Sequence, residues 1–171
     1  MRESDGSAKH LSDEQRLYLR QLEYRALKAG DAHHRSARLF DFVDTWVLGT
    51  PSLVAAFAAT ILTTITLTQS PPAFGVRLAA VLCAALSAAL TGVRNQVGAS
   101  GRAVGHQRAG VAYNALRRKT AAAAASTVGD AQLIDGLNTL YDEAGQSAPV
   151  IPRSQWNKAD TWTADAKPHP Q

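Results

Sequence analysis

Three threonines in the longest uncharged stretch of the chain recur at every fourth position, as Thr60, Thr64 and Thr68. Residues four apart lie on one face of an α-helix, so these hydroxyls would form a polar stripe. In an oligomer the stripe could line a polar pore, together with Ser87 of the next uncharged stretch. Alternatively, each threonine bonds the backbone carbonyl one turn before it and faces a neighbouring helix. The sequence leaves both interpretations open.

No pattern in the chain is typical of a catalytic site. The sequence has no glycine loop of the kind that holds phosphate, no nucleophile elbow and no ligand cluster at metal spacing. His33, His34 and His106 could approach one another on adjacent helices. Surface histidines, however, usually form hydrogen bonds or face water. We therefore expect neither catalytic nor metal-binding residues, and we do not expect an enzyme.

A basic region after the second uncharged stretch offers candidates for binding a signal or a partner: Arg102, His106, Arg108, Tyr113 and Arg117. Arginine is well suited to phosphate because its planar guanidinium presents several donors in a fixed geometry. The other interpretation is that the cations of this region anchor the chain to anionic lipid.

Two uncharged stretches predict two membrane-spanning helices, at residues 46–68 and 74–93. At 1.5 Å per residue the first reaches about 33 Å, enough to cross a hydrocarbon core of about 30 Å. The second reaches a similar length if Arg77 extends to the membrane interface. Paired prolines interrupt the two helices, so residues 69–73 are expected to form a short external loop. A soluble chain of 171 residues would have too little amphipathic helix to cover both stretches.

Most of the positive charges lie before the first uncharged stretch and after the second, and few lie between the two stretches. The formal net charge is +4, and the connecting region contains only Arg77. The cations close to the outer ends of the two stretches are Lys28, Arg35, Arg38, Arg94, Arg102 and Arg108. By the positive-inside rule, this distribution places both termini in the cytoplasm. It also explains the basic excess without nucleic acid, so we expect no stable nucleic-acid binding.

The predicted fold is an all-α membrane protein: a two-helix transmembrane hairpin with long cytoplasmic helical extensions and a short C-terminal amphipathic helix. Ser12 and Gln15 form a capping-box pattern at the start of the first extension, in which Gly30-Asp31 leaves a break possible. Outside the hairpin we expect a disordered tail at 1–11, helices at 12–45 and 94–127, an amphipathic helix at 130–145 and an extended tail at 146–171.

Ridges of small residues predict close helix packing. Two of them lie in the predicted spans and are expected to pack within the hairpin and between copies of it. The third follows the second span and is expected to lie against another backbone, most simply the helix before the first span. The three ridges are Ala55 and Ala59, then Ala84, Ala88 and Gly92, then Gly101, Gly105 and Ala109.

Two sequence motifs lie after the second predicted span. The first reads Gly101-Arg102-Ala103-x-x-His106-x-Arg108-Ala109-Gly110-x-x-Tyr113-x-x-Leu116-Arg117-Arg118, directly after the second span. The second reads Ala148-Pro149-x-Ile151-Pro152-x-x-x-Trp156-x-x-Ala159. In this order around two spans, the motifs resemble the SLATT domain family, over about residues 15–160.

The resemblance implies a multi-pass effector of the bacterial inner membrane, acting in nucleotide-signalled or reverse-transcriptase-associated anti-phage defence. Members of the family are proposed to form pores that kill or arrest an infected cell, a form of abortive infection. The implied partners are the lipid bilayer, further copies of the chain, and a nucleotidyltransferase, a SLOG-type sensor or a reverse transcriptase encoded nearby. No cofactor is expected, although a cyclic nucleotide could be a ligand, directly or through a partner.

We therefore predict a homo-oligomeric, pore-forming effector that depolarises the membrane. The alternative is a non-conducting membrane scaffold that recruits a partner enzyme through its cytoplasmic helices. Leucine at Thr60 and Thr64 would separate the two, because only a pore requires the hydroxyl stripe.

Overall fold

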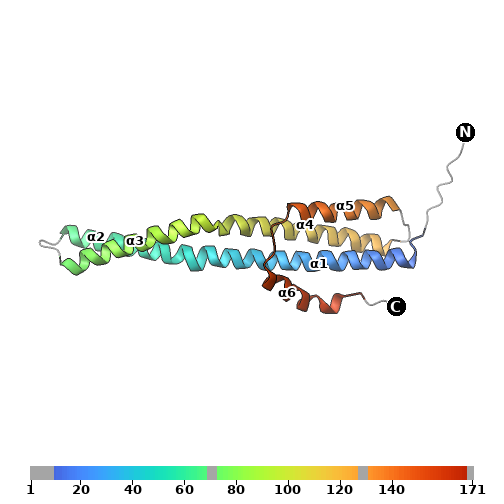
Figure 1. The fold of residues 1–171 in the computed structure, drawn as a ribbon, viewed down its shortest axis with the longest axis horizontal. Helices are drawn as coiled ribbons and strands as arrows, with labels where there is room; N and C mark the ends of the chain where they lie inside the picture. Colours follow the sequence, from blue (N-terminus) through green and yellow to red (C-terminus); the bar gives the residue numbers. More distant parts are fainter. Residues whose placement is uncertain (1–9, 69–72, 127–130, 169–171) are drawn as a thin grey trace, which may run out of the picture. The chain divides into compact units, whose positions relative to one another are not determined.

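A computed structural model describes residues 10–68, 73–126 and 131–168, and in these ranges the protein is helical without a β-strand. Residues 69–72 of the predicted loop and residues 1–9 of the predicted tail lie outside the described residues. The helices, labelled in Figure 1, are α1 (Asp13–Phe42), the π-helix η1 (Val43–Gly49), α2 (Thr50–Thr68), α3 (Phe74–Val97), α4 (Ala99–Ala125), α5 (Ala131–Ser147), α6 (Arg153–Trp162) and the 3₁₀ helix η2 (Ala164–Ala166).

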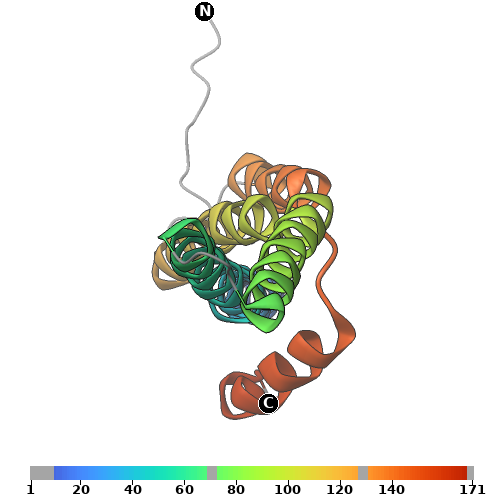
Figure 2. The same ribbon diagram turned by 90° about the vertical axis from the view of Figure 1, so that its left-hand side faces the viewer.

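The chain divides into two compact units, and the first comprises Met1–Ala37 and Val104–Gln171. In its described part, α1, α4 and α5 lie side by side, and α6 packs on the side of α1 away from α5 (Figures 1 and 2). The hydrophobic core of this helical bundle comes from α1, α4 and α5 and from Leu11, two residues before α1. Its buried members are Leu11, Leu19, Leu22, Ala26, Ala29, Tyr113, Leu116, Ala123, Leu137 and Ala144.

Helix α1 begins as the sequence predicts. The Ser12 amide donates to Gln15 Oε1 over 2.9 Å, and the Gln15 amide donates to Ser12 Oγ over 3.1 Å. This reciprocal capping box satisfies amides that a helix start leaves unpaired. The helix then continues through Gly30 and Asp31 without a break. Gly30 lies against α4, where an added Cβ would be 3.3 Å from Asn114 Oδ1.

The second unit comprises Arg38–Ala103 and contains η1, α2 and α3. Helices α2 and α3 are antiparallel. Two contacts show this: Asp44 contacts Arg94 near the outer ends of the helices, and Ser52 contacts Ser87 further in. Helix α3 ends at Gly98, whose φ of 57° is the left-handed conformation that glycine adopts most readily. The predicted boundary between 74–93 and 94–127 is therefore displaced to Gly98.

The prediction of an extended tail over 146–171 is wrong for its middle part, which forms α6 and η2. The prolines suggested an irregular segment, but Pro152 precedes the helix and occupies its N-cap position. A proline there costs no helical hydrogen bond, because the first amides of a helix have no partner within it. Gln155, Ala159 and Thr163 are buried at four-residue intervals, so one side of α6 is covered.

Candidate functional site

Two helical stretches, Asp13–Thr68 and Phe74–Ala125, each contain an apolar window long enough to cross a membrane. Their apolar parts are α2 and α3, which form the candidate functional site. On α2 the covered side carries Ser52 and Ala55, and on α3 it carries Ala80.

Hydroxyl groups join α2 to α3 at one level. The Ser52 hydroxyl lies 2.8 Å from Thr91 Oγ1 and 3.2 Å from the carbonyl oxygen of Ser87. In the other direction, the Ser87 hydroxyl donates to the Ser52 carbonyl oxygen over 3.0 Å. Interhelical hydrogen bonds of this kind contribute about 1 kcal/mol in apolar surroundings. The sequence suggested that Ser87 lines a pore together with the threonines. In the structure Ser87 instead contributes to the contact between α2 and α3.

The threonine stripe lies outside that contact. Thr60, Thr64 and Thr68 are exposed within this chain. Their hydroxyls donate to the carbonyl oxygens four residues earlier, over 3.0, 3.0 and 3.2 Å. The back-bonding considered from the sequence is thus present. The oxygen lone pairs still face outward, so the stripe offers acceptors to whatever covers it.

The two small-residue ridges of the spans have different positions. Ala55 is buried and Ala59 is half-buried, so this pair permits the close approach of α2 and α3, as predicted. Ala84, Ala88 and Gly92 are exposed, and a Cβ added at Gly92 would meet nothing within 4 Å. The expectation that this second ridge packs inside the hairpin is therefore wrong. The ridge remains uncovered by the described part of the chain.

An ion pair joins the last turn of α3 to η1, the π-helix that precedes α2. Arg94 contacts Asp44 through two hydrogen bonds, from Nε to Oδ1 over 3.0 Å and from Nη2 to Oδ2 over 2.6 Å. These hydrogen bonds from Arg94 hold the pKa of the Asp44 carboxyl below its usual value. Asp44 belongs to the π-helix η1, and such turns are rare and frequently found at functional sites. A Cβ at Gly49 would lie 2.8 Å from the Asp44 carbonyl oxygen, so this turn requires glycine.

In the helical bundle, His33 of α1 and His106 of α4 approach each other, as the sequence had suggested. Their Nδ1 atoms are 2.9 Å apart, and both side chains are buried. Because only one hydrogen fits between the two nitrogens, one ring donates and the other accepts. Burial, followed by repulsion from His106 and His34, lowers the pKa of His33 from 6.5 to about 4. Burial also lowers the pKa of His106. The pair is therefore neutral at pH 7.

An aromatic stack continues from this histidine pair. The Tyr113 ring lies parallel to the His33 ring at 5.6 Å and edge-on to Tyr141 of α5 at the same centroid distance. Beside it, His34 accepts from Asn114 Nδ2 over 2.9 Å and faces Gln107 Oε1 at 3.3 Å. Burial raises the pKa of both tyrosines. The stack joins α1, α4 and α5 through the polar centre of the bundle.

The predicted signal or partner residues do not form one cluster. His106 and Tyr113 are buried in the histidine and aromatic stack, whereas Arg108 is exposed and Arg117 is half-buried. Arg102 is exposed in the other unit and lies over the Phe40 ring at 5.8 Å. The motif mixes both kinds of residue because α4 turns one face to α1 and α5 and the other face outward.

The third ridge of small residues is only partly a packing surface. Ala109 is buried, and a Cβ at Gly105 would lie 3.0 Å from the Pro149 side chain. At Gly101 an added Cβ would meet nothing within 4 Å, so the prediction that another backbone lies there is wrong. The closest approach occurs one position beyond the ridge, at Gly110. A Cβ at Gly110 would lie 2.8 Å from the His34 ring.

Several contacts of the site had a usable signal in the sequence. The pairs Asp44–Arg94 and Ser52–Ser87 are both centred near position 69 of the sequence, just before the paired prolines. In two antiparallel helices such residues come to the same level. The described residues contain no group of three or more metal-ligating side chains.

Comparison with known proteins identified no relative: no protein family, no curated protein and no solved structure matched this chain.

Proposed function

We propose that this chain is a two-span protein of the bacterial inner membrane with both termini in the cytoplasm. The observation that carries the proposal is the exposure of its most apolar helices. Only 28% and 6% of the residues in the two apolar windows are buried within the chain. Phe57 of α2 is 71% exposed and Leu82 of α3 is 60% exposed. A soluble protein covers such surface, whereas lipid covers it at no hydrophobic cost.

We further propose that the α2–α3 pairs of several copies associate and form a weakly selective pore that depolarises the membrane. One pair of helices encloses no conduit, so a pore requires several copies. The exposed ridge at Ala84, Ala88 and Gly92 would permit close contact between copies. The outward threonine stripe would then supply acceptors to water and ions.

The biological setting of the proposal follows from the resemblance to SLATT domains alone. It is an effector role in bacterial anti-phage defence, with a nucleotidyltransferase, a SLOG-type sensor or a reverse transcriptase as partner. A cyclic nucleotide would act on the protein directly or through such a partner. The exposed cations Arg102, Arg108 and Arg118 remain available for a phosphate-bearing ligand or for anionic lipid.

A second candidate function, a non-conducting membrane scaffold, is favoured by two observations. The threonine hydroxyls already donate to their own helix, so they can face lipid without an unsatisfied donor. The bundle also carries an apolar groove of about 500 Å³ between α4 and α5, lined by residues that include Lys119, Leu133, Leu137 and Leu140. Such a groove is suited to a partner helix.

The double variant Thr60→Leu/Thr64→Leu separates the two functions. In bacteria induced to express the chain, we expect depolarisation measured with a voltage-sensitive dye, and we expect the double variant to abolish most of it. Leucine removes the acceptors that lower the barrier to ions. Thr63→Leu is the matched control, because the exposed Thr63 also bonds its own helix but lies outside the stripe. Equal depolarisation by wild type and double variant would contradict the pore lining; normal insertion of the wild type without depolarisation would favour the scaffold.

A further inference from the structure

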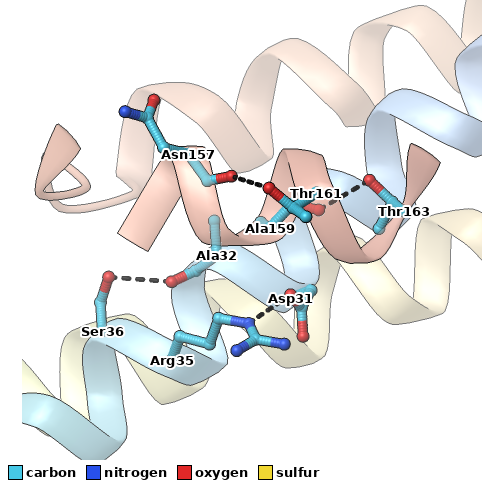
Figure 3. Close-up of polar contacts among 8 residues, drawn as sticks. All are labelled: Asp31, Ala32, Arg35, Ser36, Asn157, Ala159, Thr161 and Thr163. Atoms are coloured by element: carbon cyan, nitrogen blue, oxygen red, sulfur yellow. Dashed lines mark hydrogen bonds and ion pairs between the residues drawn. The ribbon is translucent and has the colours of Figure 1, made fainter. Parts of the chain in front are cut away.

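The contact between α6 and α1 is formed largely by charges and aromatic rings. Lys28 of α1 forms an ion pair with Asp160 of α6 over 2.6 Å. The same ammonium lies 4.7 Å from the centre of the Trp156 ring. About two helical turns further along α1, the Arg35 guanidinium lies 5.1 Å from the Trp162 ring. Arg35 is held in place by Asp31 over 2.6 Å, as Figure 3 shows.

The apolar surface that α6 buries is limited to Ala159 and part of the Trp156 side chain, which is 37% exposed. The covered side of α6 carries only Gln155, Ala159 and the adjoining Thr163. In Figure 3, Ala159 lies over Ala32 of α1, which is fully buried. The described members of the hydrophobic core cluster include no residue of α6. The core of the bundle is therefore formed without this helix.

Helix α6 is also connected in a way that permits it to move as a unit. It has ten residues, and isolated helices shorter than about 12 residues are marginal in water. Its helical state therefore depends on docking. The preceding residues 149–152 have no regular secondary structure, and Val150 is exposed. Pro149 lies against Gly105 of α4, which fixes one end of this connection and leaves Val150–Pro152 as a hinge.

We propose that α6 is an exchangeable arm that docks on α1 of a second copy of the chain. The contact is self-complementary, because every copy carries both the cations of α1 and the Asp160 and tryptophans of α6. Two copies that exchange arms form the same contacts twice, which is the usual route of domain swapping through a hinge. The inference rests on the self-association proposed above and assigns a surface to it.

Charge reversal tests the exchange. Lys28→Asp and Asp160→Lys each place like charges in the contact, so α6 should undock in either variant alone. In the purified full-length proteins in detergent, we expect hydrogen–deuterium exchange of the α6 amides to rise severalfold in both, because two like charges replace the ion pair. Asp165→Lys, an equal charge change on the same segment outside α6, should leave exchange unchanged.

Mixing the two variants gives the decisive result. Between copies, the native α6 of the Lys28→Asp chain meets the native α1 of the Asp160→Lys chain, and the two reversed charges meet each other. Both arms should regain protection, and because their peptides differ in mass, each arm is followed separately. Exchange in the mixture that equals that of the separate variants would show that α6 docks only on its own chain and would overturn the inference.

Two further outcomes remain distinct. Unchanged α6 exchange in both single variants would also overturn the inference, because the Lys28–Asp160 pair would then not hold the arm. Failure of the pore, by contrast, would appear as an unchanged membrane potential, which the exchange measurement does not depend on. Rescue by mixing together with a silent membrane would retain the arm and reject the conducting function.

Discussion

Arginine at positions 82 and 86 is expected to remove α3 from the membrane. Leu82 and Leu86 are 60% and 53% exposed and lie near the middle of the predicted second span. Each arginine at the centre of a membrane helix costs about 3 kcal/mol on insertion scales, so the pair costs about 6 kcal/mol. We expect Leu82→Arg/Leu86→Arg to lose most of the membrane-embedded protein after a carbonate wash.

The matched control places the same two changes in the helical bundle. Leu133 and Leu140 of α5 are also exposed, at 42% and 39%. Because α5 lies outside the proposed spans, Leu133→Arg/Leu140→Arg should remain in the membrane fraction like the wild type. If the variant with arginines in α3 is retained equally well, α3 is not in contact with lipid and the two-span proposal is wrong.

Acid is expected to destabilise the helical bundle through the His33–His106 pair. The pKa of His33 falls from 6.5 to about 4 on folding, so the folded state binds fewer protons than the unfolded chain between these values. The stabilisation is complete above about pH 6.5 and is lost as the pH falls towards 4. A shift of this size corresponds to roughly 3 kcal/mol. Two protonated rings also cannot keep their 2.9 Å contact, because both nitrogens would carry hydrogen.

The measurement is denaturant unfolding of the bundle at pH 7.5 and pH 5, followed by circular dichroism in detergent. The matched variant is His33→Leu/His106→Leu, which removes both partners of this hydrogen bond together. Its loss of stability between the two pH values should be clearly smaller than that of the wild type. Parallel pH dependences for the two proteins would mean that the histidine pair is not the origin of the acid effect.

The sequence predicted the parts of the fold that depend on composition and local pattern. The uncharged stretches correspond to α2 and α3, and the Ser12–Gln15 pattern forms a capping box. Local rules were insufficient for α6, because its helix depends on the distant partners Lys28 and Arg35. A ten-residue segment that is marginal alone gives no strong helical signal in the sequence.

The candidate site was less predictable from the sequence. Whether a residue of α2 or α3 is covered depends on which side of its helix packs against the other helix, and the sequence pattern does not give that side. Ser87 was grouped with the threonines by its hydroxyl, but the pairing of α2 and α3 turns it inward. The ridge at Ala84 and Ala88 was expected to pack both within the pair and between copies, and it lies outside the pair. For His33 and His106 the sequence indicated proximity but not burial, although His33 lies on the uncharged face of α1 that also carries Leu22, Ala26 and Ala29.

The membrane location of α3 can be tested most directly with a single thiol. Cys83 is the only cysteine of the chain, so Cys83→Ala provides a background for Leu82→Cys, at a position that the described part of the chain leaves 60% exposed. Ser154→Cys, on the exposed side of α6, is the control. In opened membrane vesicles, a water-soluble maleimide should label the thiol at position 154 and leave that at position 82 unlabelled until detergent denatures the protein, because the reactive thiolate requires water. Equal labelling at both positions before denaturation would contradict the account, since Leu82 would then face water and not lipid.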